Sequence, residues 1–191
     1  MDELILQGCR AGESQAIETL VRQSEGVVYR ICLSILNYPA DAEDATQETF
    51  IAVLRALPGF RGDSAFNTWM YAIAVNICRR HLKQSKRRQA IHTSLTLDPA
   101  VFGDHSPDPE QTLIRSEVAD ALWSAVCELD EQHRLPVILR YYHELSVAEI
   151  AQILDISEGT AHSRLFNARE RMRGLMKIRE TLFKEKKGLR R

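Results

Sequence analysis

Apolar side chains recur every three or four residues along this chain, and that spacing restricts its fold more than any other feature of the sequence. Residues 16–36 show the pattern clearly, with an apolar face made of Ile17, Leu20, Val21, Val28, Ile31 and Ile35. A helix turns once in about 3.6 residues, so these side chains fall on one face. The alternation of β-branched residues that marks a strand is missing. The sequence therefore predicts an all-α protein, and its 191 residues suffice for one or two domains.

Turn residues divide the first half of this helical pattern. A stop and turn are predicted at residues 37–39, and Asp41 is the expected N-cap of a helix that ends near Leu57. A further helix is expected from about Ser64 to Lys86. Together these helices predict an N-terminal helical domain over residues 12–87.

The pattern then breaks and resumes. Residues 88–111 lack periodicity and combine Pro99, Pro107 and Pro109 with acidic residues, which predicts a flexible acidic linker. Periodicity returns over residues 112–177, which predict a C-terminal domain of about four helices. A basic tail follows at 178–191, where disorder is favoured over a role in phosphate attraction.

Charge is segregated along the chain, although the formal net charge is only −1. Residues 79–88 hold six Lys or Arg and no acid, and residues 162–191 hold eleven Lys or Arg against three Glu. An acidic block contains Asp41, Glu43, Asp44 and Glu48. A chain that binds DNA at one surface and a basic protein at another would show this distribution.

The helix expected from residue 64 carries two stripes at helical spacing. The apolar stripe, which suits a core, consists of Phe66, Met70, Ile73 and Ile77. The polar stripe, which offers an amide and cations to a nucleotide, consists of Asn76, Arg79 and Lys83 with Arg80 beside it. For an isolated helix, a solvated basic face is the simpler interpretation. A second DNA-binding signal downstream favours nucleic acid instead.

That second signal is a helix-turn-helix pattern at residues 146–160. Ser146 and Glu149 form a capping-box sequence, residues 155–156 predict the turn, and Ser157 is the expected cap of the second helix. The predicted inward set is Ile150, Ile153, Leu154, Ala161, Leu165 and Ala168, and the predicted outward set is His162, Ser163, Phe166, Asn167 and Arg169. Outward polar groups early on a second helix suit reading of the major groove, with Arg164 and Arg171 along the flanking backbone. The alternative is an ordinary helical hairpin with a charged face.

With these features in family order, the whole chain resembles a bacterial RNA polymerase sigma factor of the extracytoplasmic-function (ECF) type. The motifs that carry the resemblance are Asp-Ala-Glu-Asp-Ala-Thr-Gln-Glu-Thr-Phe at 41–50, Phe-Arg-Gly-Asp-Ser-Ala-Phe at 60–66, Thr-Trp-Met-Tyr-Ala-Ile-Ala-Val-Asn at 68–76, Glu-Leu-Ser-Val-Ala-Glu-Ile-Ala at 144–151, Ser-Glu-Gly-Thr at 157–160 and Ser-Arg-Leu at 163–165.

The resemblance implies three sets of site residues. Contact with the clamp of the largest polymerase subunit falls to Asp44, Gln47 and Glu48, which share a helix face by their spacing. Capture of the non-template strand at the −10 element falls to Arg61, Asp63, Ser64, Phe66, Trp69, Asn76, Arg79, Arg80 and Lys83. Trp69 either stacks on a base or belongs to the core. Reading of the −35 duplex falls to Ser157, Thr160, His162, Ser163, Arg164, Phe166, Asn167 and Arg171.

Two of the −35 positions depart from the family pattern. Relatives often carry Lys or Arg where His162 and Asn167 stand, and fewer cations mean less bidentate reading of guanine. The promoter sequence therefore stays open, although the role does not.

The expected partners are core RNA polymerase, through its clamp and through its flap for the C-terminal domain, and promoter DNA. The resemblance adds a cognate anti-sigma factor, membrane-bound or not. No cofactor or metal is expected, because the four cysteines form no C-x-x-C pair. The N-terminus lacks the pattern of a signal peptide, and no run is long enough to insert in a membrane, so the expected location is the cytoplasm.

Two rival functions are considered. A stand-alone helix-turn-helix regulator would need only residues 113–180 and would leave the acidic face and the polar stripe without a role. An enzyme is not expected, because the sequence shows no Gly-rich phosphate loop and no recognisable nucleophile–base or carboxylate pair.

Overall fold

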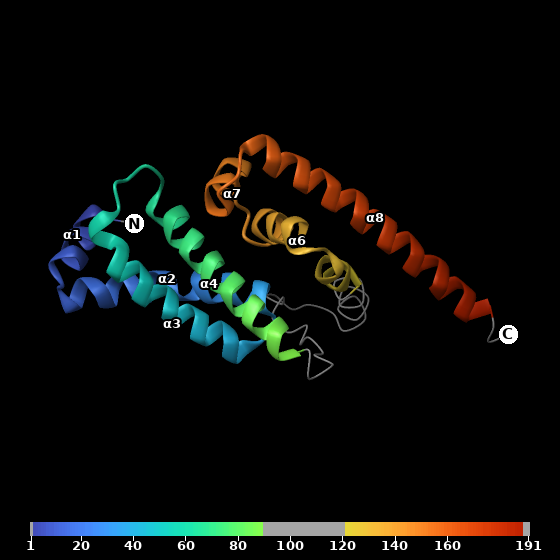
Figure 1. Ribbon diagram of the computed structural model, residues 1–191, viewed down its shortest axis with the longest axis horizontal. Helices are drawn as coiled ribbons and strands as arrows, with labels where there is room; N and C mark the ends of the chain where they lie inside the picture. Colours follow the sequence, from blue (N-terminus) through green and yellow to red (C-terminus); the bar gives the residue numbers. More distant parts are fainter. Residues whose placement is uncertain (1, 90–120, 189–191) are drawn as a thin grey trace, which may run out of the picture.

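The computed structural model describes residues 2–89 and 121–188. These residues are helical almost throughout, without a strand, as predicted (Figure 1). The N-terminal part comprises α1 (Glu3–Ala11), α2 (Ser14–Leu36), α3 (Pro39–Ala56), the single-turn helix η1 (Leu57–Gly59) and α4 (Phe66–Gln89).

Local sequence signals set the ends of these helices. Asn37 ends α2 in the left-handed conformation with φ 59°, which an Asn side chain tolerates better than most. The next helix begins at Pro39, not after Asp41, so the predicted cap is wrong. Proline suits the first helical turn because it has no N–H to leave unpaired, and Tyr38 takes the cap position. Asp41 instead lies in the first turn of α3, where its charge favours the positive end of the helix dipole.

The first helix precedes the range predicted for the N-terminal domain. Asp2 caps α1 by accepting a hydrogen bond from the Leu4 N–H at 3.1 Å. Leu6 and Cys9 of α1 are buried in the same core as α2. The N-terminal bundle therefore includes α1.

The C-terminal part contains a helical stretch at residues 121–128, then α6 (Glu131–Val137), the π-helix η3 (Ile138–Tyr142), α7 (Val147–Leu154) and α8 (Glu158–Gly188). Residues 90–111 of the predicted linker, and the start of the predicted C-terminal domain, lie outside the described residues. The backbone of α8 continues to Gly188, so the preference for disorder is wrong for residues 178–188.

The core of the N-terminal bundle lies between α2, α3 and α4. Leu20, Ile31 and Val53 are fully buried there. The predicted apolar stripe of α4 faces this core, since Met70 is 1% exposed and Phe66 and Ile77 are nearly buried. The helical periodicity thus correctly identified the faces of α2 and α4 that pack inward.

The two parts of the chain share one apolar cluster. The helix-turn-helix residues Ile150, Ile153 and Leu154 belong to the same buried cluster as α2, α3 and α4, because α7 packs against α4 (Figure 1). A smaller cluster within the C-terminal part contains Val126, Leu129, Val137, Ile138, Leu165 and Ala168. In the described residues, the two helical domains are therefore docked on each other.

Candidate nucleic-acid and polymerase interfaces

The helix-turn-helix has the caps that its sequence predicts. The Ser146 hydroxyl accepts from the Glu149 N–H at 3.2 Å, and the Glu149 carboxylate accepts from the Ser146 N–H at 2.9 Å. Asp155 ends α7 in the left-handed conformation with φ 54°. The Ser157 hydroxyl then caps α8 by accepting from the Thr160 N–H at 3.1 Å. These contacts fix the angle at which α8 leaves the turn.

The first turns of α8 expose the side chains predicted to read DNA. His162, Ser163 and Asn167 are exposed, and the aromatic ring of Phe166 is 63% exposed. Ala161, Leu165 and Ala168 on the opposite face are buried. Exposure of an apolar ring to water is unfavourable. A Phe ring in this position therefore suits contact with a thymine methyl group or another apolar surface. Arg164 is half-buried beside this face.

Arg171 is engaged within the protein. Its Nη1 donates to Asp130 Oδ2 at 2.6 Å and lies 3.1 Å from His133 Nδ1. Although desolvation opposes the shift, hydrogen bonds from His133 and Arg171 lower the pKa of Asp130 to about 2. Asp130 also caps α6, by accepting from the His133 N–H. Arg171 thus ties α8 to α6 in this structure, in addition to the phosphate role predicted for it.

A second arginine on the exposed face of α8 has a partner that the sequence did not indicate. Arg169 Nε donates to the Tyr141 hydroxyl at 2.5 Å, and its guanidinium lies 5.4 Å from the centre of the Tyr141 ring. Tyr141 is 51% exposed and belongs to the π-helix. Twenty-eight residues separate the pair, and no local pattern indicates such a contact.

The loop before α4 is held by aromatic side chains. Phe60 lies 4.9 Å from Trp69 and 5.6 Å from Phe66 between ring centres. Phe66 is 7% exposed, a burial that favours support of the loop over direct DNA contact. Trp69 is half-buried, between the two roles considered for it. At the tip of this loop Arg61, Gly62 and Asp63 are exposed, with Gly62 at φ 81°, and Ser64 is half-buried.

The polar stripe of α4 lies at the surface, but its arginines are paired. Asn76, Arg80 and Lys83 are exposed. Arg79 is half-buried, and its Nε donates to Glu131 Oε1 of α6 at 3.1 Å. Its Nη1 also reaches the Asn76 side-chain oxygen at 3.5 Å.

The predicted polymerase-binding face lies directly beside this stripe. Asp44 and Gln47 of α3 are exposed, and Glu48 is half-buried. The Glu48 carboxylate accepts from Arg80 and lies 3.1 Å from His81 Nε2. Desolvation by burial raises the pKa of Glu48, but the hydrogen bonds from His81 and Arg80 outweigh it. The pKa of Glu48 is therefore lowered from its ordinary value. Glu48 is therefore ionised near neutral pH and shared between α3 and α4.

The described residues show neither a candidate metal site nor a candidate membrane span. No group of three or more His, Cys, Asp or Glu side chains there is arranged to hold a metal ion. No helix there has both the length and the apolar character needed to cross a membrane.

Two family models match the chain. Residues 20–88 match Sigma-70 region 2, and residues 119–172 match Sigma-70 region 4. The first match covers most of α2, all of α3 and the polar stripe of α4, and the second covers the helix-turn-helix.

Relatives and solved structures agree with these matches. The RNA polymerase sigma-H factor of Pseudomonas aeruginosa is 33% identical over 175 residues, covering 88% of this chain and 90% of that protein. The ECF RNA polymerase sigma-E factor of Escherichia coli K12 is 32% identical over 176 residues, which cover 88% of this chain and 91% of that protein. The fold is similar to that of CnrH, solved in complex with the cytosolic domain of CnrY, with a TM-score of 0.66, 20% identity and coverage of 93% and 97%. It is also similar to the sigma factor RpoE of Bartonella quintana, solved with the anti-sigma factor NepR, with a TM-score of 0.63, 21% identity and coverage of 84% and 96%. The chain therefore belongs to the extracytoplasmic-function family of RNA polymerase sigma factors.

Proposed function

We propose that the two domains of this sigma factor divide promoter recognition between them. The N-terminal domain docks on the clamp of core RNA polymerase through Asp44, Gln47 and Glu48, and presents α4 and the loop before it to the non-template strand of the −10 element. The C-terminal domain contacts the polymerase flap and reads the −35 duplex with the outward face of α8.

One arrangement of the molecule carries this proposal. An exposed acidic face on α3 lies beside a cationic stripe on α4, in the same chain as a capped helix-turn-helix with exposed polar groups. An acidic face suits a basic protein partner, and cations suit a phosphate backbone. A stand-alone regulator would leave residues 20–88, which match Sigma-70 region 2, without a role.

The experiment that tests the proposal is binding to purified core RNA polymerase. Replacing Asp44, Gln47 and Glu48 together by Ala should abolish or strongly weaken binding, because the basic clamp loses its carboxylate partners. A matched control replaces Glu18, Gln23 and Glu25, which are also two carboxylates and an amide on an exposed helix surface, in α2. The control should bind like the wild type. Equal binding by both triple variants would refute the docking site.

In this proposal the chain itself catalyses no reaction. The chain selects promoters and polymerase performs synthesis, so its place of action is the cytoplasm, where polymerase works. We also include a cognate anti-sigma factor, membrane-bound or soluble, as a partner. The support for it is that a sigma factor of similar fold was solved in complex with an anti-sigma factor. Co-purification of the chain from its native cells tests this, and recovery of polymerase alone would count against it.

A further inference from the structure

The interface between the two domains joins groups that lie far apart in sequence. Arg79 of α4 pairs with Glu131 of α6 at 3.1 Å, and Ser34 of α2 lies 3.0 Å from His143 Nε2. The buried apolar side chains of α7 also belong to the cluster of the N-terminal bundle. The contact therefore combines buried apolar side chains with two polar pairs, and Ser34 of the second pair is itself buried.

The ion pair uses a residue that the −10 surface needs. Arg79 lies on the polar stripe of α4, between the exposed Asn76 and Lys83. Its guanidinium nitrogen holds a carboxylate oxygen of Glu131 at the distance that a phosphate oxygen would occupy. The side chains of Arg79 and Glu131 are 24% and 33% exposed, so water only partly screens the pair.

The docked arrangement is also too compact for a promoter. The −35 and −10 elements are about 25 base pairs apart, which at 3.4 Å per pair is about 85 Å along the duplex. In the structure α7 of the helix-turn-helix packs directly on α4. One docked molecule therefore cannot place α8 on one element and α4 on the other, and the two domains must separate to engage both.

We propose that Glu131 is an intramolecular competitor of DNA for Arg79, so that domain docking masks the −10 surface of the free chain. This inference rests on the proposed function for the role of α4. When the domains separate, Glu131 moves away from α4, and the Arg79 guanidinium becomes free to bind a phosphate. Glu48 of α3 pairs with Arg80, so both arginines of the stripe are paired in the docked chain.

Binding of the free full-length chain to single-stranded DNA tests the competition. The probe is a fluorescein-labelled single strand of about 20 nucleotides of mixed sequence, at low salt, followed by anisotropy. Glu131→Gln keeps the shape of the side chain and removes its charge. It should bind the strand roughly two- to fivefold more tightly than the wild type, the range expected for one partly exposed ion pair. The salt dependence should steepen by about 0.7 in log–log slope, one added phosphate contact.

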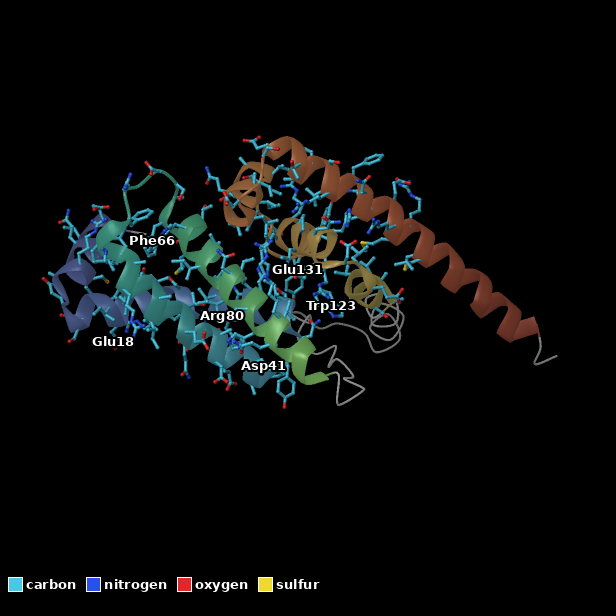
Figure 2. The ribbon with its side chains drawn as sticks, viewed as in Figure 1. Glu18, Asp41, Phe66, Arg80, Trp123 and Glu131 are labelled. Carbon is cyan, nitrogen blue, oxygen red and sulfur yellow. The ribbon has the colours of Figure 1, made fainter. Side chains whose placement is uncertain are left out.

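Two further variants separate competition from a general charge effect. Glu18→Gln removes one negative charge from an exposed site on α2, away from α4 (Figure 2). Arg79→Gln removes the contested cation, alone and together with Glu131→Gln. The proposal requires that Glu131→Gln increase the affinity for the strand more than Glu18→Gln does. It also requires that Glu131→Gln give no increase in affinity when Arg79 is replaced by Gln. An equal gain from Glu18→Gln, a gain that persists without Arg79, or no gain at all would overturn it. Binding to core polymerase is measured on the same proteins, so loss of the sigma-factor role would be seen separately from loss of the competition.

Discussion

His143 makes the docked fold sensitive to mild acid. The ring lies at the domain interface, with Nε2 3.0 Å from the Ser34 hydroxyl. That hydroxyl donates its own proton to the Ile31 carbonyl at 2.9 Å, so the neutral His143 ring satisfies the contact by donating from Nε2. Burial lowers the pKa of His143 to about 4, and the positive charge of Arg30 acts in the same direction.

The sign of the effect follows from this lowered pKa. The unfolded chain takes up a proton on this histidine below its ordinary pKa of 6.5, while the folded chain does not do so until about 4. The contribution of neutral His143 to stability is therefore complete above pH 6.5 and is lost as the pH falls toward 4. The full shift corresponds to about 3 kcal/mol, and lowering the pH from 7 to 5 should remove about 2 kcal/mol.

Urea unfolding followed by helical circular dichroism measures this loss. The wild type is compared with His143→Gln, whose side-chain amide can still donate to Ser34 but does not titrate. Between about pH 7 and pH 5, the wild type should lose about 2 kcal/mol more of its free energy of unfolding than the variant. Carboxylates contribute little in this window because their unfolded pKa values lie near 4. Equal losses in the two proteins would refute the assignment of the pH effect to His143.

Two further predictions concern the helix-turn-helix. Ser146→Ala removes the capping box of α7 and should lower the free energy of unfolding by about 1 kcal/mol. The control Ser163→Ala, at an exposed position on α8, should change the free energy of unfolding by less than about 0.5 kcal/mol. Equal urea midpoints for the two variants would contradict the role of the cap. Phe166→Ala should also leave stability nearly unchanged, because the ring is 63% exposed, yet weaken retention of promoter duplex by the reconstituted holoenzyme in a gel-shift assay. Unchanged retention would exclude Phe166 from the −35 contact.

Local sequence patterns predicted most of the secondary structure. The apolar stripe of α4 and the caps at Ser146 and Ser157 were predictable because helix periodicity and capping depend on residues three or four positions apart. The start of α3 was misplaced because two signals compete there. Pro39 and Asp41 both favour a helix start, and the helix begins at Pro39.

The pairings of the candidate sites could not be predicted in the same way. Arg79 and Glu131 are 52 residues apart, and Ser34 and His143 are 109 residues apart. Such contacts depend on how two helical domains dock, and periodicity only says which faces are apolar. The sequence therefore indicated which cations lie on the polar stripe, but not that a carboxylate of the other domain holds one of them.

Transcription with purified components tests the central claim most directly. Core RNA polymerase is incubated with fragmented genomic DNA from the source bacterium, with and without the full-length chain, and the 5′ ends of the transcripts are mapped. The account predicts new start sites that appear only with the chain and share sequence motifs near −35 and −10. The same start sites with and without the chain, although the protein is folded and free of an inhibitor, would contradict it.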